Sequence, residues 1–160
     1  MSLHVEAWRI ASDTPDYEAH DLTGKGAEIT GGRWNRKGTP MVYAASSQAL
    51  ACLDSVVHVG GSIALPLNRY LVQVLIPISV WKARTVFKIA DHVGWDAQPA
   101  GRVSLDWGTA WASGKTTALA IVPSVIVPDE TNVLINPSHA GAAGIKAKKV
   151  RKWTYDYRIK

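Results

Sequence analysis

The stretch that decides the fold is residues 31–47, GGRWNRKGTPMVYAASS, which leads into an apolar run. After the glycine-rich turn and its proline, the apolar residues Met41–Ala45 predict a short strand. The two serines that end the stretch are favourable N-caps, so we expect a helix that runs to about Val59 and ends at Gly60-Gly61. A turn, a strand and a helix therefore follow one another directly.

Outward from this unit, the patterns predict further short strands and a second helix. The strongest strand is Tyr70–Pro77, and Ser104–Ser113 carries aromatic and apolar residues at helical spacing up to Gly114. The remaining strands are predicted at 7–10, 80–89, 117–122, 124–127, 131–135 and 149–155, with loop over 11–32. We expect one α+β domain over residues 1–160, with a mixed sheet of about six or more short strands and two or three helices.

The composition is that of a folded protein outside the membrane. The chain has 160 residues, of which 47% are hydrophobic and 19% charged, and no run of about 18 apolar residues occurs. Its N-terminus lacks a basic start followed by an apolar stretch, so we expect no secretory signal. Cys52 is the single cysteine, which fits a packing role and a reducing compartment. We therefore expect a cytoplasmic protein.

The net charge of +5 is concentrated at the end of the chain. Seven lysines and arginines stand against Asp156 in residues 146–160, so this segment carries +6 and the first 145 residues carry −1. Such a segment suits a phosphate contact, a docking surface for an acidic protein, a solvated face, or an edge strand with protective charge. Because the rest of the chain is nearly neutral, we do not predict direct binding of nucleic acid.

Three side chains in the quoted stretch have the chemistry of a nucleotide site. Arg33 follows two glycines, which let the backbone approach a ligand closely, and its guanidinium suits a diphosphate. Trp34 is expected to offer an exposed flat face beside it, and Tyr43 lies in the predicted strand. Alone, these residues are weak evidence, since any basic turn can contain similar side chains.

Asp54 lies on the apolar face of the predicted helix. The buried stripe is predicted as Leu50, Leu53, Val56 and Val57. Asp54 points the same way, and a carboxylate there either braces a neighbouring loop or faces a cavity and serves an electropositive ligand atom. His58, one turn further on, is either its partner or a structural histidine.

A guanidinium group, aromatic rings and one carboxylate together fit a nucleotide with a labile glycosidic bond. NAD is the commonest nucleotide of this kind. Neither GxGxxG nor GxxxxGK[ST] occurs, so the two common phosphate-binding loops are missing. With one cysteine and scattered histidines, no metal site is predicted.

The chain resembles the RES domain family, which is named for an arginine, a glutamate and a serine. Five separated motifs carry the resemblance, in the family's order. They read Trp8-Arg9-Ile10, Gly32 through Ser47, Asp54 with Val57-His58, Val122-Pro123-Ser124, and Asn132-Val133-Leu134-Ile135-Asn136-Pro137. Where the family usually has glutamate, this chain has Asp54, which is one methylene shorter.

The resemblance implies an ADP-ribosyltransferase-like fold and a toxin that depletes NAD by hydrolysis or phosphorolysis. It also implies an Xre-type helix-turn-helix antitoxin as partner, in large symmetric assemblies with several toxin copies. By matching motifs, the catalytic residues are Arg33, Tyr43, Asp54 and Ser124, and Arg9 is a further basic residue near the NAD phosphates.

The expected reaction breaks the nicotinamide–ribose bond through an oxocarbenium-like centre, with NAD as substrate and no cofactor or metal. Arg33 and Arg9 would clamp the pyrophosphate, and Tyr43 and Trp34 would wall the nicotinamide or ribose. Asp54 would bond a ribose hydroxyl or stabilise the cation. Ser124 would orient the amide or ribose, or else would bond its own backbone as a turn serine.

Three alternatives stay open from the sequence. In the first alternative, the group that accepts the ADP-ribose is a protein side chain instead of water or phosphate, so the chain is a protein ADP-ribosyltransferase. In the second alternative, the chain binds NAD but is catalytically weakened by the shorter Asp54, because a displacement of the carboxylate by about 1 Å costs on the order of a hundredfold in rate. Finally, the chain is a non-catalytic module that binds a nucleotide or a partner protein.

Overall fold

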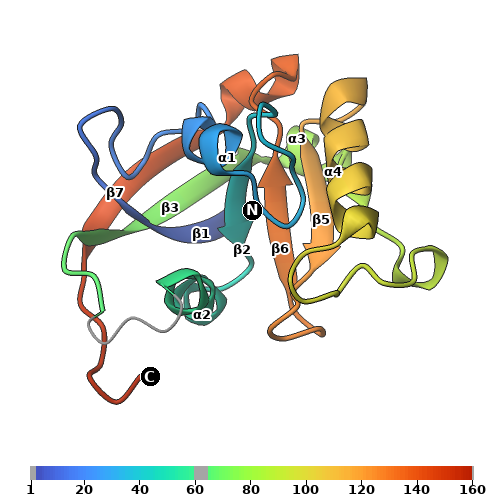
Figure 1. The fold of residues 1–160 in the computed structure, drawn as a ribbon. Coiled ribbons are helices and arrows are strands. Elements are labelled where there is room, and N and C mark those ends of the chain that lie inside the picture. The colour runs from blue at the N-terminus through green and yellow to red at the C-terminus, as the bar shows by residue number, and fades with distance from the viewer. Residues whose placement is uncertain (1–2, 60–64, 160) are drawn as a thin grey trace.

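The computed structural model describes residues 3–59 and 65–159, in which the strands form one seven-stranded sheet (Figure 1). The strand order is β4-β5-β6-β2-β1-β3-β7. Only β4 and β5 pair in parallel, so the sheet is mixed, as predicted. The strands are β1 His4–Ser12, β2 Val42–Ala45, β3 Arg69–Pro77, β4 Thr85–Val86, β5 Leu119–Pro123, β6 Thr131–Ile135 and β7 Lys146–Trp153.

The helices that accompany the sheet confirm the predicted α+β class. The α-helices of the described residues are α1 Lys25–Thr30, α2 Gln48–Val59, α3 Ile78–Lys82 and α4 Arg102–Gly114, with 3-10 turns η1 Ile89–Asp91 and η2 Ala140–Gly144. The predicted helices correspond to α2 and α4, whereas α1 and α3 are additional short helices. The predicted stop of α2 at Gly60-Gly61 lies outside the described residues. None of the described helices is long and apolar enough to cross a membrane.

The strand predicted over 80–89 is wrong, because the chain changes direction before it. β3 ends at Pro77, and the N–H of Ile78 donates to the carbonyl of Leu3 at 3.1 Å. This contact turns the chain into α3, and only Thr85–Val86 of the predicted strand pairs with the sheet. The tertiary contact therefore overrides the local β preference of these residues.

The strand predicted over 124–127 is a turn that joins the antiparallel strands β5 and β6. The Ser124 hydroxyl oxygen accepts hydrogen bonds from the N–H groups of Ile126 and Val127, both at 3.1 Å. Ser124 also donates its own N–H to the carbonyl of Glu130 at 2.9 Å. The loop predicted over 11–32 is likewise wrong in part, because α1 lies within it.

The sheet divides into two halves where β1 meets β2. β1 pairs with β2 at the single register pair Trp8↔Ala45, whereas it pairs with β3 along its full length from His4 to Ser12. Figure 1 shows β2, β6 and β5 side by side, while β1 and β3 extend away from these three strands to the side where β7 lies. β7 pairs only with β3 and ends the strand order, which confirms the edge-strand interpretation of the basic segment.

Helix α2 buries only part of the predicted stripe, in which Leu50 is buried as predicted and Val56 is half-buried. Leu50 and Ala51 are buried against Trp8 and Ile10 of β1. Leu53 and Val57, predicted to be buried, are 40% and 57% exposed. The helical period was correctly inferred, but the spacing alone did not identify which side of the helix faces the sheet. Further along the inward side, Asp54 follows Leu50 and Ala51 by one turn.

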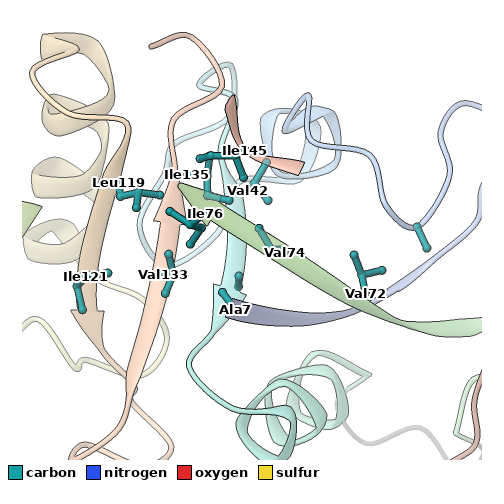
Figure 2. Close-up of a cluster of buried hydrophobic side chains, with 12 residues drawn as sticks. Ala7, Val42, Val72, Val74, Ile76, Leu119, Ile121, Val133, Ile135 and Ile145 are labelled. Carbon is teal, nitrogen blue, oxygen red and sulfur yellow. The ribbon is translucent and has the colours of Figure 1, made fainter. Parts of the chain in front are cut away.

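The main core fills one face of the sheet and spans both of its halves (Figure 2). Its branched side chains come from β2, β3, β5 and β6 and from Ile145 just before β7. The labelled residues are Ala7, Val42, Val72, Val74, Ile76, Leu119, Ile121, Val133, Ile135 and Ile145. This shared core holds the two halves together in spite of their single register pair.

A second, aromatic cluster joins α4 to the turn that contains Arg33. Trp34 contacts Phe87 edge-on at 4.9 Å and Trp107 edge-on at 5.8 Å, and it stacks on Trp95 at 6.2 Å, all between ring centroids. A Cβ built on Gly108 of α4 would lie 1.8 Å from the carbonyl oxygen of Trp34, which is closer than any real contact. The helix therefore reaches the turn only because residue 108 has no side chain.

We expect Gly108→Ala to lower the free energy of unfolding by about 2–3 kcal/mol, because the methyl group forces α4 away from the backbone of the turn. Thermal and urea unfolding measure the effect. The matched control is Gly114→Ala in the same helix, where an added Cβ meets no atom within 4 Å. Gly114→Ala is expected to be neutral or stabilising. Equal stabilities of the two variants would contradict the close approach.

Candidate functional site

A cavity of about 560 Å³ opens where β1 and β2 diverge, a volume typical of small-molecule sites. It is bounded by the C-terminal half of β1, the segment that leads through α1 to the 31–34 turn, β2, and the inward side of α2. Residues around 98–100 and 123–132 complete the wall. Of the residues predicted for the site, Arg9, Arg33, Trp34, Tyr43 and Asp54 line this cavity.

The turn that carries Arg33 is held by a buried asparagine that the sequence analysis did not single out. Asn35 is fully buried, and its amide nitrogen donates to the carbonyls of Ala27 at 2.8 Å and Thr39 at 3.0 Å. Its amide oxygen accepts a hydrogen bond from the Tyr43 hydroxyl, which itself accepts from the backbone N–H of Trp34 at 3.0 Å. Burial raises the pKa of Tyr43 well above its ordinary value. Tyr43 is thus a neutral brace of the turn as well as part of the wall.

The Arg33 guanidinium spans to the opposite edge of the cavity. Its Nη1 donates to the carbonyls of Trp95 at 3.2 Å and Ala97 at 2.9 Å, and its Nη2 donates to Gln98 Oε1 at 2.9 Å. Partial burial lowers the pKa of Arg33, and the charge of Asp96 raises it. The guanidinium is therefore a cation whose direction is fixed by three acceptors on one segment.

Arg9 is the most deeply enclosed cation at the cavity. It projects from β1, and its Nη1 donates to the carbonyl of Asp21 at 3.2 Å. Its buried Nε has no hydrogen-bond partner among the described residues. Burial lowers the pKa of Arg9, while the charges of Asp21 and Tyr17 raise it. The charge of this half-buried guanidinium at the cavity is suited to an anionic ligand.

Asp54 faces the cavity from α2 and is only partly exposed. Its Oδ2 accepts a hydrogen bond from Asn132 Nδ2 at 2.8 Å. Burial raises the pKa of Asp54, and the Asn132 hydrogen bond and the charge of His58 act in the opposite direction. His58 Nδ1 itself contacts the backbone carbonyl of Asp54 at 2.7 Å, so its direct contact is not with the carboxylate.

Two predicted residues are placed differently from the expectation. Ser124 is fully buried and does not line the cavity, since its hydroxyl oxygen is used in the turn before β6. Trp34 is 2% exposed, and its ring packs in the aromatic cluster instead of presenting a free face. Both motifs identified the residue but not the direction of its side chain.

The cavity contains further polar residues to which the sequence analysis gave no role. They are Lys25, Arg69, Gln98 and Asn132, with Glu18 and Asp21. Asn132 is the one with a local signal, because it is an amide within a strand whose other residues are mostly apolar. Within the described residues, no group of three or more histidines, cysteines and acids is arranged to hold a metal ion.

The raised pKa of Asp54 predicts a pH-dependent stability difference. Because its pKa is higher in the folded than in the unfolded chain, the ionised form destabilises the fold, and this cost is present above the folded pKa and absent below the unfolded one. Asp54→Asn keeps an oxygen for Asn132 and removes the charge. Its melting temperature should exceed the wild-type value at pH 7, and the difference should vanish below the ordinary aspartate pKa of about 3.9. A constant difference across pH would contradict this assignment.

Comparisons with known proteins agree with the motifs. The model of the family described as "RES domain" matches residues 6–158. A protein named "Prs ADP-ribosylating toxin" from Sphingobium sp. (strain YBL2) is 60% identical over 153 residues, covering 95% of this chain and 94% of its own. Proteins named "Toxin Res" from Yersinia enterocolitica (serotype O:8 / biotype 1B) and Pseudomonas putida are 37% and 33% identical, over 77% and 95% of this chain and 79% and 97% of their own. The chain therefore belongs to the RES domain family.

Proposed function

We propose that this protein is the toxin of a toxin–antitoxin pair and that it consumes NAD by breaking the nicotinamide–ribose bond. The observation that carries the proposal is the convergence of Arg9, Arg33 and Asp54 on one cavity. The names of the relatives, which include "toxin" in each case, support the biological role.

The charges around the cavity suit a ligand that is anionic at one end and cationic at the other. The lining contains four lysines and arginines and three acidic residues, namely Arg9, Lys25, Arg33, Arg69, Glu18, Asp21 and Asp54. The pyrophosphate of NAD would interact with the guanidinium groups of Arg9 and Arg33, which both line the cavity. The ring nitrogen of nicotinamide is positively charged, and so is the ribose carbon as the bond breaks.

Asp54 is the residue that we assign to this positive charge. Its carboxylate, held by Asn132, would stabilise the oxocarbenium-like ribose or accept a hydrogen bond from a ribose hydroxyl. The electron pair of the breaking bond leaves with nicotinamide, which becomes neutral, and the acceptor then attacks the ribose carbon and loses its proton. Tyr43 supports Arg33 through the turn, and Ser124 supports the segment whose neighbours Val125 and Ile126 line the cavity.

For the acceptor, we propose a protein side chain, with hydrolysis or phosphorolysis as the second candidate. The relative at 60% identity is named as a toxin that ADP-ribosylates Prs, and the similarity extends over nearly both chains. This similarity includes the segments that bound the cavity. We accordingly propose a protein acceptor of the same kind, with NAD as the only small-molecule substrate and the cytoplasm as the place of action.

We propose a neutralising partner of the Xre type, with a helix-turn-helix domain, that covers the cavity in an assembly containing several toxin copies. The family membership supports this pairing. Co-expression with the protein encoded next to the toxin gene should restore the growth of host cells and yield a stable complex on size-exclusion chromatography.

Purified protein incubated with NAD and added Prs in phosphate buffer should release nicotinamide, and Arg33→Ala should reduce the rate by about a hundredfold or more because the pyrophosphate loses its guanidinium contact. The matched control is Arg36→Ala in the same turn, because Arg36 does not line the cavity and forms an exposed ion pair with Asp106. Its rate should stay close to wild type. Equal losses in both variants would assign the effect to the turn and not to the ligand contact.

The acceptor is identified with NAD labelled in the ADP-ribose part. Transfer of label to added Prs, with little free ADP-ribose, supports the protein acceptor, whereas free ADP-ribose or its 1-phosphate in phosphate buffer supports the second candidate. Tight NAD binding without turnover, with turnover restored by Asp54→Glu, would show that the shorter acid has disabled the chain and would overturn the proposed activity.

A further inference from the structure

The Asp54 carboxylate is held across the cavity by an amide that lies far away in the chain. Asn132 Nδ2 donates to Asp54 Oδ2 at 2.8 Å, and the same nitrogen lies 3.2 Å from the carbonyl oxygen of Ala44. Asp54 comes from α2 and Asn132 from β6, so the contact joins the helix to the sheet.

The chemistry of its neighbours fixes the orientation of this amide. A carboxylate and a carbonyl are both acceptors, and the side-chain NH2 group of asparagine has two hydrogens to donate. If the amide were turned over, its oxygen would face Asp54 Oδ2 and the Ala44 carbonyl, and three acceptors would meet without a proton. The nitrogen of Asn132 therefore faces Asp54.

The backbone of Asn132 is held more firmly than the backbone of Asp54. Its backbone pairs on both sides, with Ala45 of β2 and with Val122 of β5, so it stands on an interior strand of the sheet. Helix α2 instead covers β1 and β2 from one side, and its residues Leu53 and Val57 are exposed, with Val57 lining the cavity. The rigid partner of the pair is thus the amide.

We propose that Asn132 is a positioning residue that sets the direction of the Asp54 carboxylate in the cavity and stabilises its ionised form. Its use in catalysis rests on the proposed function, but the contact itself does not.

Several charged or titratable groups share the cavity with Asp54 and must be considered in any titration. His58 lies on the same helix. From the other elements, Arg9, Tyr43, Arg33, Arg69, Lys25, Glu18, Asp21 and Tyr17 line the cavity, and Glu130 contacts Ser47 at the start of α2. Of these, His58 is the one whose charge acts on Asp54 together with the Asn132 hydrogen bond.

The test is a 13C NMR titration of the Asp54 side-chain carboxyl, with its signal assigned by Asp54→Asn. In Asn132→Ala the titration should move to higher pH, because the ionised form loses a donor. In Asn132→Asp it should move further, because two facing carboxylates hold one proton between them. Nicotinamide release should fall by about tenfold to a hundredfold in kcat with little change in KM, and the acidic limb of the pH profile should move in the same direction.

Asn136→Ala is the control, since Asn136 is an asparagine at the end of β6 that donates to the carbonyl of Ala112 at 2.8 Å. Asn136 is buried, whereas Asn132 is half-buried. It should lower the melting temperature without moving the Asp54 titration. Exchange of both groups in Asp54→Asn with Asn132→Asp should restore part of the melting temperature lost in Asn132→Asp but not turnover, because a carboxylate at position 132 gives the Ala44 carbonyl no donor. An unchanged titration in Asn132→Ala, or an equal shift in Asn136→Ala, would overturn the proposal. If the wild type releases no nicotinamide while the titration shifts as expected, the proposed function fails and the positioning contact stands.

Discussion

The site depends on the shortness of the hydrogen-bonded ladder between β1 and β2, which has one register pair. β1 and β2 meet at Trp8↔Ala45, and each is otherwise paired on its outer side, with β3 or with β6. Paired strands lie about 4.8 Å apart, so a longer β1–β2 ladder would close the space that Arg9 and Tyr43 border. The common core, which draws on both halves of the sheet, makes this interruption tolerable because it holds the halves together where only one register pair joins them.

The polar side chains at the opening depend on amide partners, of which Asn35 is buried and Asn132 is half-buried. Asn35 is such a partner for the Arg33 turn, and Asn132 is one for Asp54. An amide can donate and accept at once, which allows it to link backbone carbonyls to a side chain in a place where water is scarce. Loss of one partner leaves the others unsatisfied, so these amides are sensitive positions although they are electrically neutral.

The sequence predicted those elements whose signals are local. Thr131–Ile135 and the strand–helix unit after Pro40 have clear boundaries in turn residues and capping serines, and they were found with correct bounds or within a residue or two. Helix α1 was missed because it begins after Gly24, which has a left-handed backbone and offers no capping side chain. The strand at 80–89 failed because a distant contact at Leu3 decides the local conformation.

For the site, the sequence predicted which residues are involved more reliably than it predicted where their side chains point. Arg9, Arg33, Tyr43 and Asp54 do meet at one cavity, but their catalytic roles are still predictions. A motif does not show whether a side chain faces a ligand or its own backbone. The orientation of Ser124 could not have been derived without the turn around it. Asn132 was part of a quoted motif, but its link to Asp54 spans two elements and has no signature in the spacing.

The stacking of Trp34 on Trp95 has a practical consequence for measurement. The backbone carbonyl of Trp95 is one of the acceptors that hold the Arg33 guanidinium, so the cation at the cavity is bonded to the backbone of a residue whose indole ring stacks on Trp34. Any anion that draws the guanidinium toward itself changes the surroundings of that pair. The protein therefore carries an intrinsic fluorophore beside the Arg33 guanidinium, and a change in the position of that guanidinium can be followed by emission without a label.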